Sequence, residues 1–199
     1  SAPTHRSAPT AAANQAMMTS PAPAVGYGRT AKALHWLVFA LVAAQFVVAI
    51  AMPNIGRGTK PGTLINLHMS LGFTILAVIL VRWLWRIGHP VPLVTTDVPE
   101  WEAKVAGMTH KLLYALLVVN PFLGWANASA RDWDIVMFGQ SMPHLVAAQS
   151  RIGRLAGDVH VYLGWSLLML IGLHVAAALY HHFGRHDRVL QRMLPGASR

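Results

Sequence analysis

Four long apolar runs constrain the fold of this chain more than any other feature. They cover about residues 34–52, 64–86, 108–128 and 159–183. Each is close to the ~20 residues that a helix needs to cross about 30 Å of hydrocarbon. In lipid, only helices and closed barrels satisfy their backbone hydrogen bonds, and these runs show no strand-like alternation. The sequence therefore predicts an all-α fold, an integral membrane four-helix bundle.

The composition supports a membrane protein. Of the 199 residues, 54% are hydrophobic and 12% are charged, whereas soluble domains average about 25% charged residues. A chain of this size with so few charges would not stay soluble in water, so we expect most of its surface to face lipid. The chain has no Cys, which excludes disulfides, thiolate zinc sites, iron–sulfur clusters and a covalently attached c-type haem.

The amino-terminal residues differ from the rest of the chain. Residues 1–26 are rich in Ala, Pro, Ser and Thr and show no apolar periodicity. We predict that they form a disordered segment, followed by one transmembrane domain over residues 27–196. The segment has no apolar core of 7–15 residues, so it does not resemble a signal peptide.

The basic residues give the net charge of +9 and also predict the orientation. They cluster at the ends of the apolar runs, which favours membrane topology over nucleic-acid binding. With the amino terminus inside, 11 of the 16 Lys and Arg residues lie on the cytoplasmic side and 5 on the outer side. We therefore expect both termini in the cytoplasm.

Four histidines lie within the apolar runs, near the ends of these runs. Ionisable residues inside a bilayer are rare and usually functional. In the predicted orientation, two of these histidines lie near the inner surface and two near the outer surface. The inner pair is His35 and His174, and the outer pair is His68 and His160.

The spacing of His160 and His174 indicates what the two levels do. Fourteen residues of helix span about 21 Å and return to within about 40° of the same face. One helix face therefore offers two imidazoles separated by most of the membrane, and each has a partner at its own level. The sequence predicts two bis-histidine sites, and two axial imidazoles per iron are typical of a b haem that transfers electrons.

Glycines follow the outer histidines at a helical spacing. Gly72 comes four residues after His68, and Gly164 comes four residues after His160. One turn further along, each helix thus lacks a side chain on the face of its histidine. We expect the gaps at Gly72 and Gly164 to let a flat macrocycle pack against the helices, with Gly124 as a further candidate.

Other readings of these residues exist. A single buried histidine is often a packing group, and a glycine in a membrane helix often serves helix packing. A bare metal ion needs its ligands within about 2–3 Å, which two separated pairs do not provide. A proton relay normally uses intramembrane Asp or Glu, and all seven acidic residues are expected in loops and tails.

Several motifs around these histidines resemble a known family. They are Tyr27-Gly28-Arg29-Thr30, Leu34-His35-Trp36-Leu37, Asn66-Leu67-His68-Met69-Ser70-Leu71-Gly72, Val81-Arg82-Trp83-Leu84-Trp85-Arg86, His110-Lys111-Leu112-Leu113-Tyr114, Phe138-Gly139, Met142-Pro143, Asp158-Val159-His160 and Gly172-Leu173-His174. With these motifs in order over about residues 27–196, the chain is similar to the bacterial cytochrome b561 family of small four-helix dihaem proteins. The longer amino-terminal segment departs from the family pattern.

The resemblance implies two haem b groups, with His35, His68, His160 and His174 as the axial ligands of their irons. It also implies a multi-pass protein of the bacterial inner membrane that oxidises superoxide at the outer face and reduces ubiquinone. The expected partners are lipid, quinone and superoxide or another small electron donor. A redox protein partner is a further candidate, and nucleic acid is not expected.

Two other functions remain open. The first is a non-catalytic electron-carrier subunit that links the quinone pool to a separate dehydrogenase or hydrogenase partner. The second is a histidine-bearing transporter or a metal-binding membrane protein. A purified protein without haem absorption bands would favour the second.

Further residues are candidates for supporting roles. Candidate contacts to haem propionates or quinone are Arg29, Lys32, Arg82, His110 and His182. Candidates for steering superoxide are Arg57, Lys60, Arg131, Arg151 and Arg154. A positive rim attracts a small anion, but topology and lipid headgroups also explain such charges. We further expect Trp133, Val136, Met137 and Phe138 on the membrane surface.

Overall fold

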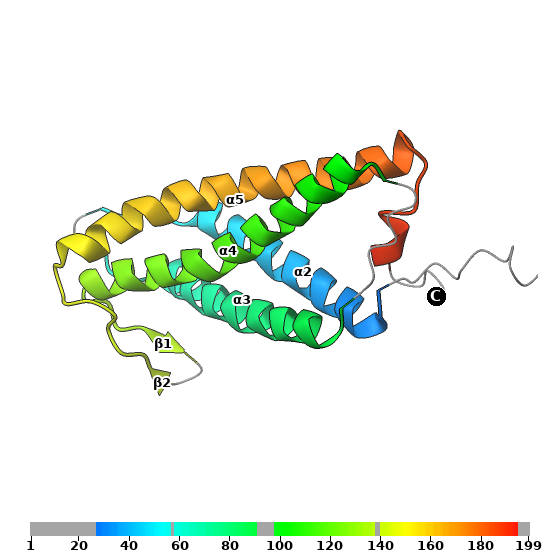
Figure 1. Cartoon of the computed structure of the whole chain (residues 1–199). Coiled ribbons are helices and arrows are strands. Elements are labelled where there is room, and N and C mark those ends of the chain that lie inside the picture. Colours follow the sequence, from blue (N-terminus) through cyan, green and yellow to red (C-terminus); the bar gives the residue numbers. More distant parts are fainter. Residues whose placement is uncertain (1–26, 57, 91–97, 138–139, 195–199) are drawn as a thin grey trace, which may run out of the picture.

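The computed structural model describes residues 27–56, 58–90, 98–137 and 140–194. The predicted disordered segment 1–26 lies outside these residues. The elements in chain order are α2 (Arg29–Ala51), α3 (Thr63–Gly88), α4 (Glu100–Ala130), β1 (Val136–Met137), β2 (Gln140–Ser141), α5 (Arg151–Phe183) and the 3-10 helix η1 (Gln191–Met193) (Figure 1). The four α-helices are all long and apolar enough to cross a membrane, which confirms the predicted fold class.

The helices lie side by side in an elongated bundle (Figure 1). The closest packing joins α2 to α3, α4 to α5, and α3 to α4. The starts of α2 and α4 lie at the same end of the bundle as the carboxy-terminal segment, and we call this the terminal end. The β1–β2 hairpin marks the opposite end, which we call the hairpin end.

Two helices begin about two turns earlier than their apolar runs. Helix α4 starts at Glu100 rather than near residue 108, and α5 starts at Arg151 rather than near residue 159. Polar contacts extend both helices. Ser150 caps α5 by accepting a hydrogen bond from the Gly153 backbone N–H, and an ion pair of 2.8 Å joins Lys104 to Glu100 one turn apart in α4.

The extended helices change where the acidic residues lie. Glu100 and Glu102 belong to the first turn of α4, and Asp158 belongs to α5. The prediction that all acidic residues lie in loops and tails was therefore wrong for these three. It counted only apolar residues as helical, whereas the helix ends continue into polar sequence.

The side chains on the outside of the bundle are strongly apolar. Tyr162, Met169 and Ile50 are each at least 70% exposed, an arrangement that water disfavours and lipid does not. A compact cluster occupies the interior midway along the bundle. We call it the apolar layer, and its buried members are Val38, Val42, Ile75, Leu76, Ile79, Leu117 and Leu167.

A second cluster closes the hairpin end. Ile65, Ala128, Trp133 and Ile135 are buried together there. Trp133 is only 6% exposed, and its indole N–H donates to the Thr59 carbonyl at 2.9 Å. The prediction that Trp133 lies on the membrane surface was therefore wrong, because its ring packs inside and its N–H finds a partner. The predicted surface residue Phe138 lies outside the described residues, and Val136 is exposed.

Small residues allow α4 and α5 to pack closely. A Cβ added at Gly153 would lie 2.4 Å from the Ala130 Cβ atom and 2.7 Å from the Ala126 carbonyl oxygen. A Cβ added at Gly157 would lie 2.4 Å from Asn127 Oδ1. Two glycines four residues apart thus form the contact face of α5, an arrangement common in membrane helix pairs.

We expect Gly153→Ala to lower the free energy of unfolding by roughly 1–3 kcal/mol, because the added methyl group meets backbone that does not yield. Thermal unfolding in detergent measures this. Gly172→Ala, on the same helix, is the matched control because nothing lies within 4 Å of its added Cβ. Equal melting temperatures for the two variants would contradict the packing role of Gly153.

The carboxy-terminal segment folds back onto the terminal end. Lys32 Nζ donates to the Leu194 carbonyl at 3.0 Å, and Trp36 Nε1 donates to the Met193 carbonyl at 2.9 Å. On α5, the ring of His181 contacts the carboxylate of Asp187. The segment after α5 is thus held against α2 at one end and against α5 at the other.

The pKa of Asp187 lies below its usual value. Burial raises this pKa, but hydrogen bonds from His181 and from the Val189 backbone N–H, together with the charge of Arg185, outweigh the effect of burial. Because this pKa is lower in the folded state, the ionised carboxylate stabilises the fold at pH values above the ordinary carboxyl pKa of about 4. This stabilisation is lost as the pH falls through the lower folded-state pKa.

We expect Asp187→Asn to remove this pH-dependent stabilisation of the carboxy-terminal segment. Hydrogen exchange at the Val189 amide, measured in detergent, reports it. At neutral pH the unmodified protein should be better protected than the variant, and the difference should shrink as the pH falls below about 4. A difference that stays constant with pH would contradict the role of the carboxylate.

Candidate functional site

The four histidines of the apolar runs meet in two pairs at opposite ends of the bundle. At the hairpin end, the ring centroids of His68 on α3 and His160 on α5 are 6.0 Å apart. At the terminal end, those of His35 on α2 and His174 on α5 are 6.5 Å apart. The structure therefore brings together the same pairs that the sequence predicts, with α5 contributing one histidine to each.

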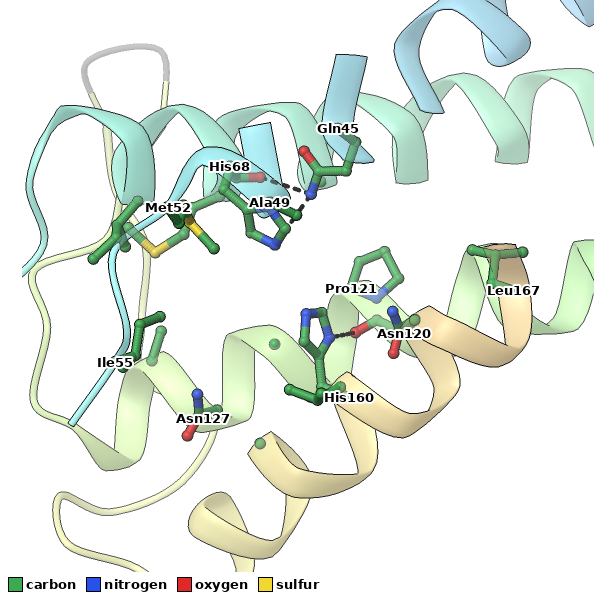
Figure 2. A pocket seen from close by; sticks show the side chains of 18 of the residues that line it. Gln45, Ala49, Met52, Ile55, His68, Asn120, Pro121, Asn127, His160 and Leu167 are labelled. Atoms are coloured by element: carbon green, nitrogen blue, oxygen red, sulfur yellow. Dashed lines mark hydrogen bonds between the residues drawn. The ribbon is translucent and has the colours of Figure 1, made fainter. Parts of the chain in front are cut away.

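A cavity of about 710 Å³ separates the two histidines of the hairpin end. Figure 2 shows the side chains of His68 and His160 on opposite walls of this cavity. Cavities of 300–1,000 Å³ are typical of sites for organic ligands. Its walls come from all four long helices, and its lining includes Gly72, Gly124 and Gly164.

The three glycines make room for different groups. A Cβ added at Gly124 would come within 3.0 Å of Cε1 and 3.2 Å of Nδ1 in the His160 ring. An added Cβ at Gly72 would lie 3.5 Å from Gln45 Nε2, and one at Gly164 would lie 3.8 Å from Asn120 Nδ2. Gly124 thus leaves space for an imidazole, whereas Gly72 and Gly164 widen the cavity beside buried amides.

Two residues that the sequence reasoning missed hold the hairpin-end histidines. The Asn120 carbonyl oxygen lies 2.9 Å from His160 Nδ1 and accepts a hydrogen bond from it. The Gln45 side-chain amide lies 3.3 Å from His68 Nε2. Gln45 is a polar residue within an apolar run, which was a signal for its contact, whereas Asn120 acts through its backbone carbonyl, which no residue type reveals.

These contacts leave the same atom of each histidine able to bind a metal. The His160 Nδ1 atom carries the proton that it donates to Asn120, so Nε2 keeps its lone pair. An amide nitrogen can only donate, so His68 accepts through Nε2, and its proton is on Nδ1. Both imidazoles therefore have the Nε2 lone pair that an axial ligand needs.

The donor set fits haem iron rather than a bare ion. Metal–imidazole bonds of about 2 Å on each side, plus the distance from each nitrogen to its ring centre, place two ring centroids about 6 Å apart. Both pairs have this spacing. Within the described residues, no group of three or more His, Cys, Asp or Glu side chains is arranged to hold a metal ion. The remaining ligands would have to come from a macrocycle, which the glycine-lined cavity can accommodate.

At the terminal end, a third histidine joins the pair. The ring of His110 on α4 lies 5.1 Å from that of His174 between centroids. Arg82 on α3 donates to the Ala31 carbonyl on α2 at 2.8 Å, within electrostatic range of His35. His110 and Arg82 thus lie beside the terminal-end pair, where the sequence places candidates for propionate or quinone contacts.

The other candidates at the terminal end lie differently. Lys32 is engaged with the Leu194 carbonyl. His182 packs edge-on against Phe183, with ring centroids 4.7 Å apart. Arg29, at the first turn of α2, is exposed.

The basic residues of the hairpin end fall into two groups. Arg131 and Arg154 line the cavity, and Arg131 donates to the Gly56 carbonyl at 3.0 Å. Lys60 and Arg151 are exposed and lie outside the lining of this cavity. Arg57 is outside the described residues.

Comparison with known proteins identifies the family of this chain. A family model described as prokaryotic cytochrome b561 matches residues 26–196. The chain is 30% identical to the probable superoxide oxidase CybB of Yersinia pestis over 81% of this chain and 92% of the relative. It is 30% identical to cytochrome b561 homolog 2 of Escherichia coli (strain K12), over 86% of this chain and 93% of that protein.

A more distant relative has a similar length. Cytochrome b562 of Cereibacter sphaeroides is 28% identical over 85% of this chain and 95% of its own. The match thus extends over all four helices and both histidine levels. The chain belongs to the prokaryotic cytochrome b561 family of haem b electron-transfer proteins, and it is a multi-pass bacterial membrane protein.

Proposed function

We propose that this protein is a superoxide:ubiquinone oxidoreductase of the bacterial inner membrane, with one haem b at each histidine level. The observation that supports this most directly is the pair of imidazoles at each end of one bundle. The relative from Yersinia pestis is named a probable superoxide oxidase. Each bound haem would supply a carrier for one electron.

The histidines divide into two haem-binding sets. His68 and His160 hold the iron at the hairpin end, while His35 and His174 hold the iron at the terminal end. Gly72 and Gly164 admit the flat ring beside the helices. The side chains of the apolar layer pack between the two levels and exclude water from the interior.

The hairpin end faces outward in this proposal, and both termini lie in the cytoplasm, as the balance of Lys and Arg favours. Arg131 and Arg154 at the cavity outnumber Asp158, the one acidic residue of its lining, and so give the cavity a net positive charge on the outer side. Such a charge raises the encounter rate of a small anion such as superoxide. Oxidation of superoxide to dioxygen removes one electron and no proton. The electron can pass to the haem without a bond between superoxide and iron, so the reaction would need no open position on the iron.

The reaction balances with two superoxide anions for each quinone. Together they supply two electrons, and ubiquinone also takes up two protons to form ubiquinol. At the terminal end, His110 and Arg82 are the best-placed candidates for contacts to haem propionates or quinone. Arg29, Lys32 and His182 remain further candidates there.

A second candidate function is an electron carrier for a separate dehydrogenase or hydrogenase. The β1–β2 hairpin favours it, because Val136 is 54% exposed on a short projection that offers a docking surface (Figure 1). Stopped-flow spectroscopy distinguishes the two functions. Superoxide that reduces the purified haems faster than it dismutates supports the enzyme, and failure to do so supports the carrier.

We expect His160→Ala to lose mainly the haem of the hairpin end and His174→Ala mainly that of the terminal end. Each variant removes one axial ligand of one site and leaves the other pair intact. Pyridine haemochrome assays and reduced-minus-oxidised spectra measure the content, which should fall from two haems per chain to about one.

Met169→Ala is a control for general damage, since this residue lies on the same helix between the two histidines, is 72% exposed on the outside of the bundle and does not line the cavity. It should keep both haems. Equal loss of both haems from each histidine variant would contradict the assignment of ligands to two levels.

We expect Arg154→Glu to slow the reduction of the haems by superoxide and to weaken the dependence of this rate on salt. Arg154 lines the cavity, so its charge lies where the anion approaches. Arg188→Glu is the matched control, because Arg188 is an exposed residue of the segment at the terminal end, away from the side where the anion approaches. Equal rates for both variants at low salt would rule out steering by Arg154.

A further inference from the structure

Two buried polar atoms beside the hairpin-end site have no partner although their residues touch. In the described part of the chain, five buried side-chain nitrogen or oxygen atoms lack a hydrogen bond. Two of them are Oε1 of Gln45 and Nδ1 of His68. One is an acceptor, and the other carries a proton in the tautomer described above. Leaving two buried polar atoms without partners costs free energy, so their presence calls for an explanation.

The contact with Gln45 determines which ring nitrogen of His68 can bind a metal. The Gln45 amide nitrogen lies 3.3 Å from His68 Nε2 and 3.0 Å from the His68 carbonyl oxygen (Figure 2). A donor at Nε2 favours the tautomer with the proton on Nδ1, so the lone pair faces the amide. This lone pair is the one that iron would take.

Binding of an iron at Nε2 would change what Gln45 contacts. The amide N–H loses Nε2 as an acceptor but keeps the His68 carbonyl. The Nδ1–H group still needs an acceptor, since metal-bound imidazoles nearly always donate from the other nitrogen. His160 already has such an acceptor in the Asn120 carbonyl. For His68, the unsatisfied Gln45 Oε1 supplies one.

The rearrangement involves only soft torsions. The last torsion of a glutamine and the ring torsion of a histidine have broad energy wells. Rotation about these torsions is therefore the movement by which Oε1 would reach Nδ1. Gln45 would then contact His68 through its oxygen rather than its nitrogen.

We propose that Gln45 is a positioning residue for His68, which selects its metal-binding tautomer and then accepts its Nδ1–H bond when haem is bound. The proposal rests on the proposed haem at this site. An acceptor at Nδ1 makes the imidazole a stronger donor to iron. Gln45 therefore favours oxidised iron and lowers the reduction potential of the hairpin-end haem.

The test is a spectroelectrochemical titration of the full-length protein in detergent, with the two haems distinguished by the His160→Ala difference spectrum. Gln45→Met keeps the length of the side chain but has no acceptor. It should raise the potential of the hairpin-end haem, so that its ratio of reduced to oxidised iron at fixed potential rises severalfold. The terminal-end haem is the internal control and should not change.

Gln45→Glu separates hydrogen bonding from packing. An ionised carboxylate is a stronger acceptor than an amide, so at high pH this variant should lower the potential. A merely structural role would shift both variants in the same direction, and this result would overturn the proposal. An unchanged potential in Gln45→Met would also overturn it.

Two further outcomes are decisive. If Gln45→Met loses the hairpin-end haem, Gln45→Glu decides alone: a lowered potential at high pH supports the proposal, and a raised or unchanged one overturns it. Unmodified protein that carries fewer than two haems would instead overturn the proposed function. Haem content is measured in the same samples, so the two failures are distinguishable.

Discussion

In the proposed function two imidazoles would share one iron, and this requirement would set the spacing of helices that otherwise touch little. The closest packing joins α2 to α3, α4 to α5, and α3 to α4. Each histidine pair instead links α5 to one of the first two helices, through His68 or His35. A macrocycle bound as proposed would therefore join helices that make few contacts of their own, and the cavity at the hairpin end offers the space for it.

The two ligands of the hairpin-end site are held by different kinds of partner. A backbone carbonyl, that of Asn120, orients His160, so this contact follows from the path of α4 and survives most substitutions. A side chain, that of Gln45, contacts His68. In the proposed haem site, single substitutions could therefore change the partner of His68 more readily than the partner of His160.

The architecture and the histidine pairs were predictable from the sequence, because membrane thickness gives each residue of a spanning helix a known depth. His160 could thus be paired with His68, and His174 with His35, by their levels in the membrane alone. Gln45 and Asn120 could not be assigned to particular histidines, since such contacts depend on how helices rotate against one another. The burial of Trp133 was missed for a related reason, because it depends on the distant Thr59 carbonyl.

The apolar layer affects the free energy of moving an electron from one histidine level to the other. Its seven members are all aliphatic, so none of them can carry a proton between the two levels, and the Tyr114 hydroxyl that packs against them has no hydrogen-bond partner among the described residues. His160 and His174 are separated by roughly 21 Å of helix out of about 30 Å of hydrocarbon. In the proposed orientation, an electron that travels inward crosses this insulator as an uncompensated charge, and a membrane potential of 100 mV, negative inside, would oppose it by about 1.6 kcal/mol. Turnover should therefore be electrogenic and should slow as the membrane becomes energised.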